Sequence, residues 1–192
     1  MHRGRLAALL AATLLIPAGL LAYALASSGH SSGAAATTPT SVGPAFDARK
    51  AVVGQPVPDF ALPSTGGNTV QLSQFKGKPV LLTFFASWCH PCEEELPQLQ
   101  KIADANRDRI AVVGVNYQDI NADSRAFVQR LGVTFPTLLE SEVTNPVAAR
   151  YGVHEIPLTY LIDAHGVLQS TPVFGPTSQH EMQTAVDTLL AG

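Results

Sequence analysis

Short apolar runs alternate with amphipathic stretches over most of the chain. Nearly continuous apolar runs at 79–86, 110–116 and 158–162 are typical of strands that are covered on both faces. Between and after these runs, apolar positions recur with helical spacing. The other elements that we expect are helices over 93–106, 121–131, 146–151 and 178–190 and a short strand over 137–139.

Two hairpin patterns flank these elements. Residues 58–62 and 69–72 alternate apolar and polar side chains around the turn-forming segment 64–68. The turn at 163–166 leads from the third apolar run into a further strand expected over 167–173. Because strands alternate with helices and a hairpin stands at each end, the pattern predicts an α/β domain with a central mixed sheet flanked by helices.

The amino end has the pattern of a targeting segment. Arg3 and Arg5 precede the charge-free run Leu6–Ala26, which as a helix would reach about 31 Å, enough to cross a bilayer. Positive charge before the run keeps the amino end in the cytoplasm and exports the rest. We expect residues 1–26 to be an uncleaved signal anchor. The alternative is a signal peptide cleaved near Ala26, since Ala24–Ala26 is a small-x-small site.

Composition separates the rest of the chain into a tether and a domain. Residues 27–44 are Ser, Gly, Ala, Thr, Pro and Val with one His, so we expect a flexible linker there and a folded domain over 45–192. That domain has ten basic and fifteen acidic residues, which argues against a nucleic-acid-binding protein. It should lie on the extracytoplasmic side of the membrane.

Only two cysteines are present, too few for a disulfide scaffold, and both lie in the segment Cys89-His90-Pro91-Cys92. This segment stands where a buried strand gives way to a helix, and a helix N-terminus favours a thiolate. The spacing brings both sulfurs onto one helix face, close enough to bridge. We therefore expect redox chemistry, with Cys89 as the more exposed nucleophile and Cys92 as the resolving thiol.

From Val53 to Leu190 the sequence resembles the thioredoxin superfamily, specifically its membrane-tethered ResA/TlpA/CcmG-like group. The motifs that carry the resemblance are Val53-Gly54-Gln55-x-x-Pro58-Asp59-Phe60, Ser73-x-Phe75-Lys76-Gly77-Lys78-Pro79, Ala86-Ser87-Trp88-Cys89-His90-Pro91-Cys92 and Gly152-Val153-His154-Glu155-Ile156-Pro157. The resemblance implies a thioredoxin-like fold and a cis Ile156–Pro157 bond facing the cysteines. It also implies that substrate contacts come from Trp88, His90, Pro91, Ile156 and Pro157.

Two positions depart from the patterns of these relatives. Thioredoxins proper have a buried acid six residues before the first cysteine, where this chain has Thr83; the ResA-like branch instead has a glutamate at the position of Glu95. We expect Glu95 to move the Cys92 proton. Leu158 stands where relatives often have Thr, which bears on substrate preference. His90 either tunes the thiolate or is an exposed residue of little effect.

The resemblance implies a thiol–disulfide oxidoreductase, more as a reductase than an oxidant, that needs no cofactor or metal. It implies disulfide-containing protein partners, such as apocytochrome c or copper-site proteins, and a membrane thiol transporter as electron donor. One alternative is a copper-binding assembly protein that uses the cysteines with His154. A peroxiredoxin-like peroxidase is the other, although Leu82 and Ala86 occupy the Pro and Thr positions of its Pro-x-x-x-Thr-x-x-Cys loop.

Overall fold

The computed structural model describes residues 50–191. The predicted anchor at 1–26 and linker at 27–44 lie outside these residues, as does the start of the predicted domain. Within 50–191, no helix combines the length and the apolar character needed to cross a bilayer.

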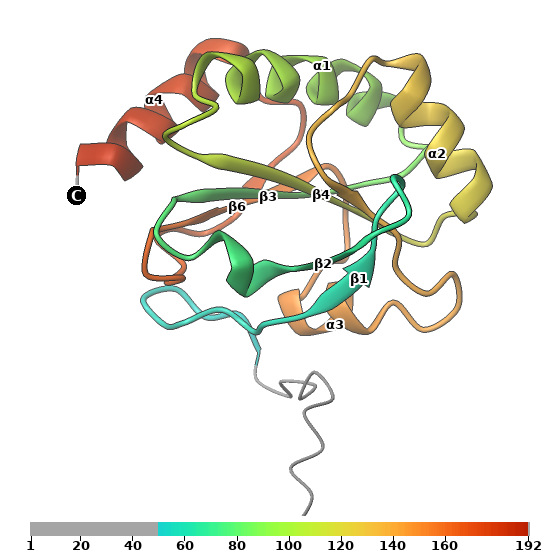
Figure 1. Ribbon diagram of the computed structural model, residues 1–192, viewed down its shortest axis with the longest axis horizontal. Coiled ribbons are helices and arrows are strands. Elements are labelled where there is room, and N and C mark those ends of the chain that lie inside the picture. Colours follow the sequence, from blue (N-terminus) through green and yellow to red (C-terminus); the bar gives the residue numbers. More distant parts are fainter. Residues whose placement is uncertain (1–49, 192) are drawn as a thin grey trace, which may run out of the picture. The chain divides into compact units, whose positions relative to one another are not determined.

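A five-stranded mixed sheet forms the centre of the described domain, in the order β5-β4-β3-β6-β7 (Figure 1). The pairs β3–β4 and β4–β5 are parallel, whereas β6 runs antiparallel to both β3 and β7. The prediction of a mixed central sheet is therefore confirmed. The strands are β3 (Val80–Phe85), β4 (Ala111–Asn116), β5 (Thr137–Leu138), β6 (Leu158–Ile162) and β7 (Val173–Phe174).

Helices cover both faces of this sheet, as the alternation of strands and helices predicted. Three helices lie on one face and the shortest lies on the other, beside a hairpin (Figure 1). The first face has α1 (His90–Ala105), α2 (Asn121–Arg130) and α4 (Gln179–Ala191), and the second has α3 (Pro146–Tyr151). Ser178 and Glu181 form a capping box at the start of α4, in which each side chain accepts the backbone N–H of the other residue.

The two ends of the sheet differ in detail from the sequence prediction. The hairpin of β1 (Ala61–Pro63) and β2 (Thr69–Gln71), followed by the 3₁₀ turn η1 (Leu72–Phe75), is a separate two-stranded sheet. Its backbone pairs with the main sheet at an isolated bridge between Ser64 and Leu138.

The strand expected over 167–173 was wrong for most of its length, because only Val173 belongs to a strand, β7. The Asp163 side chain accepts the backbone N–H of Val167 and holds the turn, and Pro172 has no N–H to donate to a ladder. Val167 and Leu168 form isolated bridges instead.

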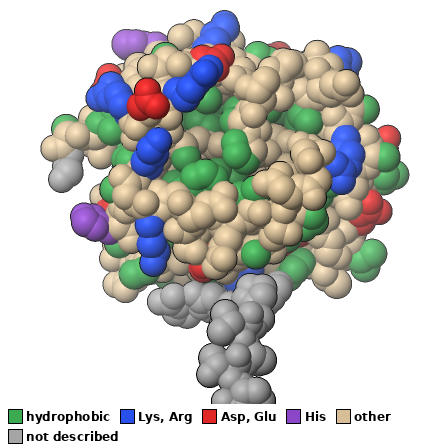
Figure 2. Space-filling model, viewed as in Figure 1, with side chains coloured by type: hydrophobic (Ala, Val, Ile, Leu, Met, Phe, Trp, Pro, Cys, Tyr) green, Lys and Arg blue, Asp and Glu red, His purple; other side chains and the backbone are tan. Residues whose placement is uncertain are grey.

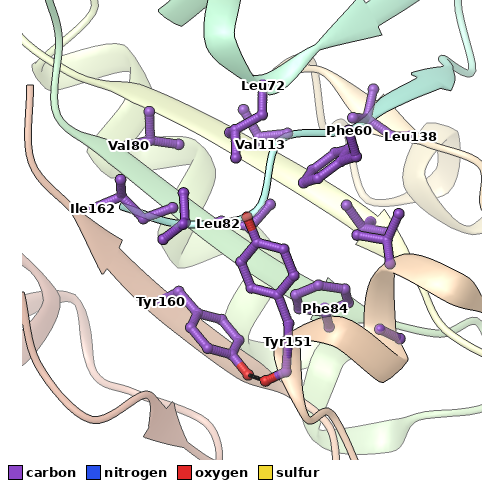
Figure 3. Packing of buried hydrophobic residues seen from close by; sticks show 14 of the residues in the cluster. Phe60, Leu72, Val80, Leu82, Phe84, Val113, Leu138, Tyr151, Tyr160 and Ile162 are labelled. Carbon is purple, nitrogen blue, oxygen red and sulfur yellow. Dashed lines mark hydrogen bonds between the residues drawn. The ribbon is translucent and has the colours of Figure 1, made fainter. Parts of the chain in front are cut away.

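The alternation of side chains along β3 divides the core into two compartments. Leu82 and Phe84 point toward α3 and the hairpin, whereas Leu81 and Phe85 point toward α1. The first compartment contains an aromatic cluster in which the Tyr160 hydroxyl donates to the Tyr151 carbonyl oxygen (Figure 3). The second compartment contains both cysteines, so the reactive pair lies between the sheet and α1.

The face of the domain turned toward the viewer in Figure 2 has a mixed surface. Acidic and basic side chains are interspersed there, and hydrophobic side chains are exposed in a hollow between them. Two clefts of the described residues have volumes of about 620 and 430 Å³, and neither is lined by a cysteine. The disulfide therefore lies outside both clefts.

Candidate active site

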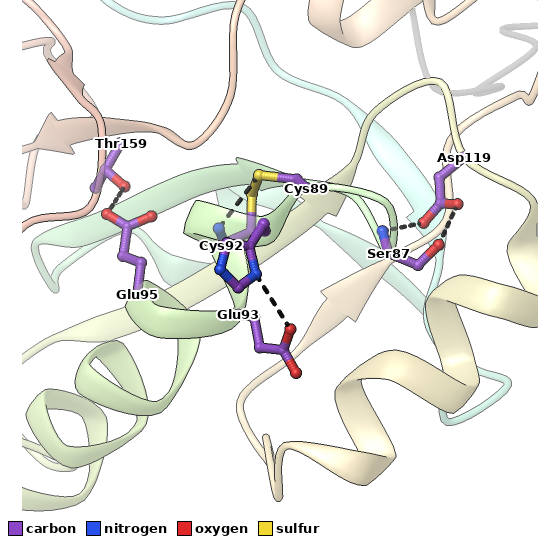
Figure 4. The surroundings of a disulfide bond; sticks show 8 residues. Ser87, Cys89, Cys92, Glu93, Glu95, Asp119 and Thr159 are labelled. Carbon is purple, nitrogen blue, oxygen red and sulfur yellow. Dashed lines mark hydrogen bonds and ion pairs between the residues drawn. A yellow bond between two sulfur atoms is a disulfide. The ribbon is translucent and has the colours of Figure 1, made fainter.

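Cys89 and Cys92 are joined in a disulfide at the start of α1 (Figure 4). Cys89 is the N-cap residue of the helix, and its sulfur accepts the backbone N–H of Cys92 at 3.2 Å. Cys89 is 4% exposed and Cys92 is fully buried, so the expected order of access holds, although neither sulfur is widely open in the oxidised state. After reduction, the N–H group and the positive end of the helix dipole would favour a thiolate at Cys89.

Glu95 lies one helical turn beyond Cys92 and is buried, with 1% of its surface exposed. One carboxyl oxygen accepts the Thr159 hydroxyl at 3.3 Å, and the other has no hydrogen-bond partner among the described residues (Figure 4). Burial raises the pKa of Glu95 to about 7, against a smaller opposing effect of the Thr159 hydrogen bond. A carboxyl with this pKa, three residues from the resolving cysteine, can accept or donate a proton near neutral pH.

Thr159, which donates to Glu95, lies opposite Thr83 on the sheet. They are direct partners across β3 and β6, and the alternation of both strands turns them toward the compartment that holds α1. Thr83 is fully buried, and its hydroxyl has no partner among the described residues. The position where thioredoxins proper have an acid is therefore part of the same buried polar group as Glu95.

The carboxylates of Glu93 and Glu94 in the first helical turn differ from that of Glu95, because solvent reaches them. Arg130 binds Glu93 through a hydrogen bond and its charge and lowers the pKa of that carboxyl, with a smaller contribution from His90. The Nδ1 atom of His90 lies 3.7 Å from Glu93, and the imidazole is 83% exposed. Glu94 is exposed. The two outer carboxylates thus fit the ordinary preference of acids for a helix N-terminus, and Arg130 was not anticipated.

The Ile156–Pro157 peptide bond is cis, as the resemblance implied. Ile156 packs against the cluster that contains both cysteines, and the Pro157 carbonyl oxygen accepts the N–H of Gly175 at 3.1 Å. Among the other predicted contact residues, Trp88 and Pro91 are exposed, as is His90. Trp88, His90 and Pro91 adjoin the cysteines along the chain, and the contact of all five residues with a substrate stays a prediction.

Asp119 is a site residue that the sequence analysis missed. Its buried carboxylate accepts both the backbone N–H and the hydroxyl of Ser87, each at 2.7 Å (Figure 4). It therefore fixes the turn two residues before Cys89. Its place just after the buried run 110–116, in the loop that follows the strand beside β3, is the signal that could have identified it.

Neither alternative chemistry finds a prepared site. Within residues 50–191, no group of three or more His, Cys, Asp or Glu side chains is arranged to hold a metal ion. His154, the further ligand of the copper alternative, is exposed. Leu82 and Ala86 are fully buried apolar residues that offer no side-chain donor to a peroxide.

Comparison with known proteins agrees with this geometry. The AhpC/TSA family model matches residues 53–171. The chain is 38% identical over 137 residues to the thioredoxin-like protein YneN of Bacillus subtilis, covering 70% of this chain and 78% of that protein. It is 29% identical to the thiol-disulfide oxidoreductase ResA of Geobacillus thermodenitrificans, covering 71% of this chain and 78% of ResA.

A solved structure extends the comparison to the fold. It is that of a secreted Mycobacterium tuberculosis disulfide oxidoreductase described as homologous to E. coli DsbE, with 27% identity and a TM-score of 0.59. The alignment covers 67% of this chain and 95% of that one. Thiol–disulfide exchange needs a cysteine pair that alternates between dithiol and disulfide, and Cys89 and Cys92 at the start of α1 form such a disulfide. The chain therefore belongs to the AhpC/TSA family, has the thioredoxin-like fold, and is a thiol–disulfide oxidoreductase of the ResA and DsbE type.

Proposed function

We propose that this protein is a reductase of protein disulfides that works outside the cytoplasm, tethered to the membrane by residues 1–26. The location rests on the charge-free run behind Arg3 and Arg5. It is consistent with the description of the similar Mycobacterium tuberculosis protein as secreted.

The observation that carries the direction of electron flow is the buried carboxyl of Glu95. A strong oxidant of this kind is one whose reduced, thiolate form is stabilised. Above about pH 7 Glu95 carries a negative charge one turn from Cys92, and in a buried setting that charge opposes a thiolate there. His90 could favour a thiolate when protonated, but it faces Glu93 and is exposed to solvent. These charges therefore favour the disulfide form of the cysteine pair, so the reduced protein gives its electrons to a partner.

The exchange proceeds in two steps that balance. The Cys89 thiolate attacks a partner disulfide, forms a mixed disulfide and releases one partner sulfur as a thiolate, which takes up a proton. Cys92 then loses its proton to Glu95 and attacks the Cys89 sulfur of the mixed disulfide. The second partner sulfur leaves as a thiolate and takes up a proton. Two electrons pass to the partner, and Cys89 and Cys92 end as the disulfide seen here.

The proposed partners follow from the family resemblance of the sequence and not from the site. That resemblance suggests apocytochrome c or a copper-site protein as the disulfide substrate. A membrane thiol transporter would return the pair to the reduced state. This cycle needs no bound cofactor or metal.

Trapping of mixed disulfides tests the proposal. Cys92→Ser leaves Cys89 able to attack but unable to complete the exchange, so partners should accumulate as disulfide-linked adducts that mass spectrometry identifies. Cys89→Ser is the matched control and should trap far fewer, because Cys92 is fully buried. A reduction potential near about −270 mV would support the reductase, whereas one near about −120 mV would assign an oxidant instead. Full activity of the double variant Cys89→Ser/Cys92→Ser would remove the pair as the active site.

A further inference from the structure

Two sequence motifs that the exchange reaction does not use meet at one small cavity. The motifs at 53–60 and 73–79 carry part of the family resemblance, and residues of both line this cavity together with residues of the turn at 163–166. Its volume is about 140 Å³. The cavity adjoins Val80, the first residue of β3, whereas the cysteines follow the last residue of that strand. Because a strand of this length spans about 17 Å, the cavity is separate from the reactive pair.

The inner part of the cavity is apolar. Four buried side chains of the compartment that contains α3 line it: Val57, Leu72, Val80 and Ile162. Val80 and Ile162 are direct partners across β3 and β6, and they lie at the end of the compartment away from Phe84 (Figure 3). An apolar cavity of about 150 Å³ can bind benzene, so this one has room for a single ring or a short alkyl chain.

The unpaired charge at the cavity is positive. Lys76 and Lys78 are exposed lining residues, and their ammonium groups have neither an ion pair nor a hydrogen bond within residues 50–191. Asp59 and Asp163 also line the cavity, but their carboxylates are already bound. In each, one oxygen accepts two backbone N–H groups and the other accepts a glutamine side chain. The lysines are therefore the charged groups that remain available to a ligand.

We propose that this cavity binds a small monocarboxylate, whose apolar body enters the cavity and whose carboxylate binds Lys76 and Lys78. Ligand sites of proteins combine an apolar wall with a few polar groups that fix the orientation of the ligand, and both are present here. A hydrogen bond from an ammonium group to a carboxylate is stronger than one between neutral groups. A neutral ligand of the same size would gain the apolar contact alone, and an anion without an apolar body would gain the charged contact alone. This binding goes beyond thiol–disulfide exchange and uses none of its residues.

Titration of the full-length oxidised protein in neutral detergent micelles, followed by methyl NMR, tests the proposal. Benzoate is the probe. Benzamide has the same ring without the charge, and acetate has the charge without the ring. Benzoate should shift the methyl signals of Val57, Leu72 and Ile162 and bind with a Kd in the millimolar range. Benzamide and acetate should each bind about tenfold or more weakly, because each lacks one of the two contacts.

The variant Lys76→Gln/Lys78→Gln should bind benzoate about tenfold or more weakly than the wild type and benzamide within about twofold of it. Lys101→Gln is the matched control, since Lys101 is an exposed lysine of α1 that does not line the cavity, and it should bind benzoate as the wild type does.

Three results would each overturn the proposal. Benzoate could leave the methyl signals of the cavity unchanged, benzamide could bind as tightly as benzoate, or the double lysine variant could bind benzoate no more weakly than Lys101→Gln. The rate of exchange with oxidised glutathione should be the same in the wild type and both variants. Failure of the reductase proposal would appear in that rate and would leave the benzoate titration unaffected.

Discussion

Glu95 makes the stability of the protein depend on pH at the scale of a single residue. Its pKa is about 7 in the folded protein and 4.5 without burial. Below about pH 4.5 both the folded and the unfolded chain hold the proton. As the pH rises toward 7 only the unfolded chain releases it, so the folded state loses about 3 kcal/mol relative to its stability at low pH. Glu95→Gln cannot ionise and should be more stable than the wild type at pH 8 by up to that amount, but similar near pH 4.5. Urea unfolding of the oxidised protein measures both.

The same substitution should also slow thiol–disulfide exchange by about tenfold or more, because general acid–base catalysis contributes at least this much. The wild-type rate should rise through about pH 7 as the carboxylate forms, and the variant should lack that rise. Glu93→Gln is the control, since Glu93 is partly exposed and paired with Arg130. Small, similar effects of both substitutions would reduce Glu95 to an ordinary acid in the first turn of a helix.

At this scale the sequence identified residues whose partners are close along the chain and missed those whose partners are distant. Cys89 and Cys92 could be paired by spacing alone. The bond from Thr159 to Glu95 spans 64 positions, and that from Ser87 to Asp119 spans 32. Such contacts depend on how the strands are ordered in the sheet, which no local pattern specifies.

At the scale of elements, periodicity predicted the helices and the buried strands to within a few residues. It failed where hydrogen bonds outside a ladder decide the conformation. Residues 167–173 have the alternation of a strand, but the Asp163 side chain and Pro172 keep most of them out of the sheet. The first hairpin was predicted, whereas its separation from the central sheet was not, because pairing between distant strands leaves no trace in either strand alone.

In strand β4, Gly114 lies close to two phenyl rings, and this packing leads to a prediction at the scale of elements. A Cβ atom there would meet a ring carbon of Phe85 at 3.0 Å, a methyl group of Thr137 at 3.3 Å and a ring carbon of Phe135 at 3.4 Å. Gly114→Ala should therefore cost about 1–3 kcal/mol of unfolding free energy, as overpacking does in close-packed cores. Thermal unfolding should show a lower Tm. In the control Gly66→Ala the nearest atoms lie at 3.5 and 3.6 Å, so equal stability of the two variants would contradict the steric argument.

At the scale of the whole molecule, composition separates an amino-terminal segment that we expect to anchor the protein from the domain that contains the disulfide. The described domain has its own two-compartment core and places the disulfide at one end of α1. The residues before it contain the run Leu6–Ala26 and a predicted linker that would reach about 23 Å on average. A domain on such a tether would meet partners close to the membrane surface, which suits exchange with a membrane thiol transporter.

The intact protein should therefore be found in washed membranes, with its domain accessible from the outside. We expect Arg3 and Arg5 to keep the amino end in the cytoplasm, and a run of this length would be long enough as a helix to cross the hydrocarbon core. High salt should leave the protein in the membrane fraction, because an inserted helix is held by its apolar area and not by charge, whereas detergent should release it. Protease added to cells whose envelope exposes this face should remove the domain. Amino-terminal sequencing of the native protein provides the decisive measurement: a chain that begins at Met1 agrees with the anchor, and one that begins at Ser27 would mean that the run is a cleaved signal peptide and the domain a soluble, exported reductase.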